Sequence, residues 1–81
     1  MYISTLTRKG GVVTLEILNH ALTAADVGRQ ITVVFPSHSD VNNVISTISQ
    51  IVPPHTLRFI QSSKLPDIDI GIGGGACAIN T

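Results

Sequence analysis

The chain has 81 residues, with five Lys or Arg and five Asp or Glu, so its formal net charge is zero. This length accommodates one small domain, and 43% hydrophobic with only 12% charged residues excludes intrinsic disorder, which requires the opposite balance. A neutral chain has no electrostatic attraction for nucleic acid or for anionic membranes, so neither is expected as a partner.

The start of the chain has no basic segment followed by an apolar core, and no apolar run approaches the ~20 residues that span a bilayer. We therefore expect synthesis in the cytoplasm without a signal peptide. The single cysteine, Cys77, excludes an internal disulfide. Isoleucine, valine and threonine together supply 27 of the 81 residues, and these β-branched side chains favour strands.

A β-hairpin is predicted at the beginning of the chain. Residues 2–7 and residues 12–18 alternate in polarity with the period of a strand. Gly10 and Gly11 lie between these segments and can adopt a positive φ, which favours a tight connection. The two strands are expected to pair antiparallel.

A short helical turn and a third strand follow the hairpin. The turn is predicted over residues 22–28, with Thr23 as its N-cap and Gly28 at its end. Residues 30–35 then predict a strand that Pro36 ends, because proline cannot donate to a sheet. The face of this strand that carries Ile31, Val33 and Phe35 is expected to lie in the core.

One longer helix is predicted between residues 37 and 52. Ser37 and Asp40 have the spacing of an N-cap and the third residue of a helix, and Pro53-Pro54 would end it. Apolar residues recur between them with helical period: Val41, Val44, Ile45, Ile48, Ile51 and Val52. Since all of these are β-branched, the helix would depend on packing against a sheet.

Residues 56–61 and 67–72 predict two further strands. The expected fold class is therefore α+β, a mostly antiparallel sheet of order β-β-β-α-β-β with one packed helix; the alternative is a small β-barrel with a helix. Residues 1–72 would form this single domain. Residues 73–81, which begin with three glycines, are expected to be a C-terminal tail packed on a neighbouring subunit.

Histidine and carboxylate residues are the first candidates for chemistry. His38 and Asp40, joined by His20 or His55, could bind a metal or transfer a proton. Their spacing is unspecific, and a polar turn at a helix start explains His38 and Asp40 equally well.

Two further segments could bind a ligand. Asp67 and Asp69 share one face of a strand and could hold a hard cation or act as acid and base in a hydrolase, although an exposed strand face explains them more simply. The glycine segment, residues 71–75, could cradle a phosphate, but no helix or lysine follows it as in phosphate loops.

The remaining reactive and basic residues indicate no catalysis. Cys77 has no neighbouring cation to lower its thiol pKa, and Arg8-Lys9 is interpreted as a solvated hairpin turn. No nucleophile elbow or assignable triad occurs. We therefore expect no enzyme activity, no cofactor, no metal and no small-molecule substrate.

The uncharged surface is the most informative feature of the sequence. Asp40 is the only charged residue between Arg29 and Arg58, and none follows Asp69. Neutral polar groups can be buried at an interface without the cost of desolvating ions. The predicted interface comprises the outer face of the helix and the tail: Asn42, Asn43, Ser46, Thr47, Ser49, Gln50, Ala76, Ala78 and Ile79.

The ten residues from Leu22 to Ile31 (LTAADVGRQI) resemble a turn-then-strand segment of phage tail-spike and other virion structural proteins, and also of bacterial Ig-like repeats. This resemblance implies a virion component and assigns no functional residue. With the neutral surface, it leads us to expect a structural subunit that assembles with copies of itself or with a larger protein lattice, such as a capsid, decoration or tail protein. The alternative is a small ligand- or anion-binding regulatory module.

Overall fold

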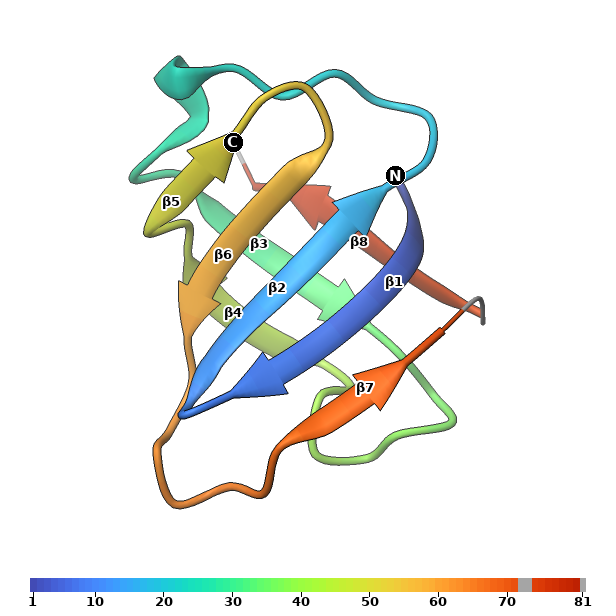
Figure 1. Cartoon of the computed structure of the whole chain (residues 1–81). Helices are drawn as coiled ribbons and strands as arrows, with labels where there is room; N and C mark the ends of the chain where they lie inside the picture. Colours follow the sequence, from blue (N-terminus) through green and yellow to red (C-terminus); the bar gives the residue numbers. More distant parts are fainter. Residues whose placement is uncertain (72–73, 81) are drawn as a thin grey trace.

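The computed structural model describes residues 1–71 and 74–80, which form a nearly all-antiparallel sheet with one short 3-10 turn at Ala24–Asp26 (Figure 1). The strands are β1 (Tyr2–Lys9), β2 (Val12–Ile17), β3 (Gln30–Val34), β4 (Val44–Thr47), β5 (Gln50–Val52), β6 (Thr56–Ile60), β7 (Ile68–Ile70) and β8 (Gly75–Ile79). No α-helix occurs in this part of the chain. The predicted α+β class is therefore wrong, and the alternative of a small barrel with a helix also lacks its helix.

The sheet folds over on itself into two layers. Its strand order is β4-β3-β8-β1-β2-β6-β5, with β7 also paired to β1. β1 belongs to both layers, because it pairs with β2 along its length and with β8 at Tyr2 and Ile3. β7 pairs with Leu6 to Arg8 and continues the layer of β2. In Figure 1, β2 and β6 run diagonally across β3 and β8, which lie behind them. We call these the β2–β6 layer and the β3–β8 layer.

The predicted hairpin and third strand are confirmed. β1 and β2 pair antiparallel through Gly10 and Gly11, which have φ of 57° and 81°. Gly11 also packs so closely against the backbone of residues 62–63 that a Cβ would overlap it. The core face of β3 is correct as well, since the side chains of Ile31, Val33 and Phe35 are all buried.

The predicted turn before β3 is also present. Asp26 closes the turn, because its carboxylate Oδ2 accepts a hydrogen bond of 3.0 Å from the Thr23 backbone N–H. Gly28 has a φ of 89° and redirects the chain into β3.

The predicted helix between residues 37 and 52 is replaced by turns and by β4 and β5. Asn43, with a φ of 60°, ends the turn segment before β4. At Ile48 and Ser49 the chain changes layers: Ile48 N–H donates to the Arg29 carbonyl (2.9 Å), and Ser49 N–H donates to the Arg58 carbonyl (2.8 Å). Val44, Ile45, Ile51 and Val52 therefore lie in strands, where stiff β-branched side chains are favoured, whereas Val41 and Ile48 are buried outside them.

The segment predicted to be a tail forms a central strand. β8 lies between β3 and β1 of the same chain, so the described part of this segment, residues 74–80, packs on its own domain. Residues 73 and 81 of the predicted tail, and residue 72 of the predicted fifth strand, lie outside the described residues.

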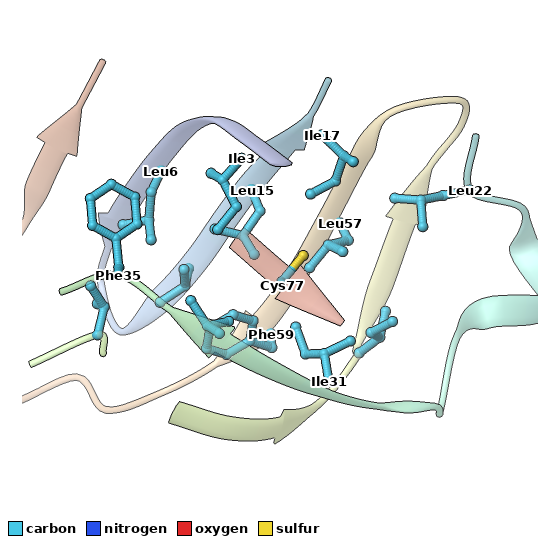
Figure 2. Packing of buried hydrophobic residues seen from close by; sticks show 14 residues of the cluster. Ile3, Leu6, Leu15, Ile17, Leu22, Ile31, Phe35, Leu57, Phe59 and Cys77 are labelled. Atoms are coloured by element: carbon cyan, nitrogen blue, oxygen red, sulfur yellow. The ribbon is translucent and has the colours of Figure 1, made fainter. Parts of the chain in front are cut away.

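The core fills the space between the two layers (Figure 2). It contains mainly leucine, isoleucine, valine and phenylalanine from β1, β2, β3 and β6 and from the loops. The Cys77 sulfur lies among these side chains in Figure 2, and the Phe35 ring packs against Gly75 of β8. A Cβ at Gly75 would overlap that ring, so the sheet requires glycine at this position.

Candidate protein-interaction surface

A fully buried arginine joins three distant segments at one end of the molecule. Arg8 on β1 is 0% exposed. Its Nε donates to the Pro66 carbonyl (2.9 Å), its Nη1 to Gln61 Oε1 (3.0 Å) and its Nη2 to Asp40 Oδ2 (2.6 Å). Gln61 Nε2 in turn donates to the Asp40 carbonyl (2.7 Å). We call these four residues the Arg8 cluster, and they fix the loops before β4 and before β7.

The Arg8 cluster corrects the interpretation of Arg8-Lys9 as a solvated turn. Only Lys9 is exposed; Arg8 points inward, on the same face of β1 as Leu6. Asp40 is its only acidic partner among the described residues, and the Asp40 side chain remains 39% exposed. The bond from Arg8 lowers the pKa of the Asp40 carboxyl below its ordinary value.

Acid should weaken the fold through Asp40. A carboxyl whose pKa is lower in the folded than in the unfolded state contributes stability above about pH 4 and loses it as the pH falls through the folded value. Asp26 has a lowered pKa for a similar reason, its bond from the Thr23 backbone, so wild type alone cannot separate the two. We expect the stability difference between wild type and Asp40→Asn to shrink from pH 5 to pH 2 in urea titrations. A difference that stays constant would contradict this role for Asp40.

The structure gives the histidines separate surroundings and does not support the candidate metal or proton-transfer site. His38 packs edge-on against Phe35, with ring centroids 5.6 Å apart, and precedes Asp40 in the loop. His55 Nδ1 instead lies 3.1 Å from the His20 carbonyl oxygen, next to the end of β2. Within residues 1–71 and 74–80, no three His, Cys, Asp or Glu side chains gather as metal ligands would.

The predicted carboxylate pair lies beside an open groove of about 420 Å³ between β1 and β7. Asp67 Oδ1 accepts a hydrogen bond from the Gly10 N–H (3.0 Å), and Asp69 lies opposite Thr7 in the sheet. Lys9 lines the same groove. Asp67 thus caps the hairpin turn, which gives it a structural role.

The glycine segment has no phosphate-loop geometry in its described part. Gly74, with a φ of 59°, leads directly into β8, and Gly75 packs under Phe35. A phosphate loop would instead open a helix, so these glycines serve turning and close packing. Residues 72–73 of the segment lie outside the described residues.

The Cys77 thiol should be unreactive in the folded protein. Its side chain is buried, and burial raises its pKa to about 11, so almost no thiolate forms near neutral pH. We expect iodoacetamide to leave the native chain unmodified at pH 8 and to add one label per chain in 6 M guanidinium, as measured by mass spectrometry. Rapid native labelling would contradict this placement.

The polar residues predicted as one helix face lie apart in the structure. Asn42 Oδ1 accepts a hydrogen bond from the Phe35 N–H (2.9 Å), and Asn43 is exposed in the turn before β4. Ser49 Oγ donates to the Arg58 carbonyl (3.0 Å), and Gln50 Oε1 accepts a bond from Arg58 Nη1 (3.0 Å). The other two members belong to β4: Ser46 is half-buried, and Thr47 is exposed.

The predicted interface residues of β8 divide by side. Ala76 and Ala78 lie directly opposite Val34 and Thr32 of β3, which places them on the outer side of the β3–β8 layer. Ile79 lies opposite the buried Ile31 and packs against the core. Thr47 lies opposite Gln30 of β3, on the same outer side. Ala76, Ala78 and Thr47 therefore share one surface, whereas Ile79 does not.

Cross-strand pairing defines this surface, which we call the β3–β8 face. One row joins Tyr2, Ala76 and Val34, and a second joins Ala78, Thr32 and Ile45. A third row contains Thr47, Gln30 and Asn80. Large apolar side chains are exposed on the face: Tyr2 by 64%, Ile45 by 60% and Val34 by 41%.

The β3–β8 face combines exposed apolar groups with polar groups that bond to one another. None of its nine residues is charged. Thr32 Oγ1 lies 3.2 Å from Asn80 Oδ1 and 3.0 Å from Asn80 Nδ2, and that amide also contacts Gln30 Oε1 (3.4 Å). Because these partners lie within the chain, Thr32 and Asn80 keep their hydrogen bonds when the face is buried.

The outer side of the β2–β6 layer carries charged residues. Glu16 lies opposite Thr5, Arg58 opposite Thr14, and Asp69 opposite Thr7. Charges of both signs thus alternate with threonines on this side. Ile60 and Val52 are exposed there as well, by 68% and 43%. The two sides of the molecule therefore differ in charge and not in apolar exposure.

The comparisons with known proteins add no further candidate. Residues 1–71 and 74–80 include no helix of the length and apolarity needed to cross a membrane. No protein-family model, no curated protein and no solved structure matches the chain.

Proposed function

We propose that the chain is a non-enzymatic structural subunit that self-assembles or decorates a larger protein assembly. The uncharged, partly apolar β3–β8 face is the observation that carries this proposal. Contiguous apolar surface of this kind marks protein interaction sites, and interface cores are depleted in charge.

A virion component, such as a capsid, decoration or tail protein, is the proposed type of assembly. The support is the segment from Leu22 to Ile31, which resembles a turn-then-strand phrase of phage tail-spike and virion proteins. In this chain the segment forms the capped turn that leads into β3, a strand of the β3–β8 face.

The test is the solution mass of the purified protein, measured by size exclusion with light scattering over concentration and salt. We expect a species heavier than the monomer that persists at high salt, because an interface without ions is insensitive to screening. Ala78→Lys, on the β3–β8 face, should lower the mass. Ile60→Lys, at an exposed position on the outer side of the β2–β6 layer, is the matched control and should not. Assembly that is equally sensitive to both substitutions would contradict the proposed surface.

A further inference from the structure

We propose that a second copy of this chain covers the β3–β8 face, so that the assembly unit is a face-to-face dimer with a twofold axis. This inference rests on the proposed function and names the partner of the same surface. The size, charge and shape of the face favour an identical copy as the partner.

The size of the face favours an identical partner. The principal extents of the molecule are 30 × 23 × 20 Å, so even its broadest side is close to the ~800 Å² per partner of a standard interface. A stable contact must therefore use nearly the whole face. A second copy presents a face of the same outline and can cover it completely.

The chemistry of the face is self-complementary. Two identical charged surfaces would repel each other, but the β3–β8 face has no charged residue. The hydrogen bonds among Thr32, Asn80 and Gln30 remain intact when another copy covers them. The outer side of the β2–β6 layer, with Glu16, Arg58 and Asp69, offers no such match.

The relief of the face also fits sheet-on-sheet packing. Ala76 and Ala78 belong to β8, whereas Tyr2 and Ile45 belong to β1 and β4 on either side. Small side chains on β8 and larger ones on the strands to either side, including Val34 of β3, let two copies interdigitate, as inner faces do in a β-sandwich. Because both copies use the same surface, the contact closes at two chains.

Light scattering and sedimentation of the full chain test the dimer. We expect a species of twice the 8.6 kDa chain mass, with no larger particle as concentration rises. Ala78→Lys should raise the dimer dissociation constant about 100-fold, because it places like charges together in the contact. Ala78 is exposed, so the variant should keep its fold, which circular dichroism and thermal unfolding can verify.

Cysteine cross-linking tests the face-to-face geometry. Ala76→Cys and Ala78→Cys place thiols on the central strand of the face, and at least one should give a disulfide-linked dimer on mild oxidation. Ile60→Cys, at an exposed position on the opposite side, should remain a monomer on denaturing gels. The native Cys77 is buried and should not contribute.

The possible outcomes separate this inference from the proposed function. A wild-type monomer at millimolar concentration overturns the dimer. Particles larger than a dimer that dissociate in Ala78→Lys also overturn it, but they support a structural subunit that uses this face. Particles that Ala78→Lys leaves intact contradict both the dimer and the proposed surface.

Discussion

Replacing Asp40 with alanine is expected to lower the free energy of unfolding by about 3 kcal/mol, the cost of leaving a buried charge without its partner. The Arg8 guanidinium is 0% exposed and its Nη2 donates to Asp40 at 2.6 Å. Without this carboxylate, Arg8 would keep only the neutral acceptors of Gln61 and Pro66. Urea denaturation followed by circular dichroism measures the change.

Two variants test that explanation of the Asp40 effect. Asp69→Ala removes another exposed carboxylate and should change the stability by at most about 0.5 kcal/mol, as at an ordinary surface position. Arg8→Met combined with Asp40→Ala should be at least as stable as Asp40→Ala alone, because no buried charge remains. A double variant that is less stable than the single one would mean that Arg8 contributes by packing and not through its charge.

Substituting Gly75 with alanine is expected to destabilise the fold by about 3 kcal/mol, the upper end of the range for an overpacked core. A Cβ at Gly75 would overlap the Phe35 ring, and both residues are buried. The ring cannot move away freely, because it is enclosed by the core. Thermal or urea unfolding measures the loss.

A rescue and a control identify the Phe35 contact as the cause. Phe35→Leu removes part of the ring volume, so the double variant should lose less stability than the two single losses added together. Gly71→Ala is the control, because a Cβ there meets nothing within 4 Å. It should be nearly neutral. Strict additivity of Gly75→Ala and Phe35→Leu would rule out this contact as the source of the effect.

Strands with clear two-residue alternation and adjacent turn signals could be predicted from the sequence. The β1–β2 hairpin follows from alternating polarity on both sides of Gly10 and Gly11. The core side of β3 follows from Ile31 and Val33 together with the stop at Pro36. In both cases the information is local, because each strand and its turn lie within a few neighbouring residues.

The helix prediction failed because two periodicities fit the same residues. Val41, Val44 and Ile48 recur at helical spacing, yet Val44 and Ile45 also begin an alternating strand. Because β-branched side chains are stiff, they favour strands over a helix in this segment. The change of layers at Ile48 depends on Arg29 and Arg58, which no local pattern reveals.

The Arg8 cluster was missed although two signals were present. Alternation from Leu6 places Arg8 on the inner face of β1, and Asp40 is the only charged residue between Arg29 and Arg58. Combining a buried cation with that isolated carboxylate would have suggested their pairing. The pairing itself joins residues 32 positions apart, which composition and spacing cannot establish.

The candidate surface was only partly predictable for a related reason. Lack of charge drew attention to Thr47, Ala76 and Ala78, which the structure brings to one face. Tyr2 and Ile45 also belong to the face, and their membership depends on the strand order. A sequence shows which residues are neutral, whereas the register of the sheet determines which of them are neighbours.

The insertion of β8 between β1 and β3 has a consequence for synthesis on the ribosome. Before Gly75–Ile79 emerge, the hairpin formed by β3 and β4 has no strand that connects it to β1. The nascent chain must therefore carry two open sheet edges until β8 has been made. Such edges invite pairing with other chains, so slow translation between β4 and β8 would favour aggregation.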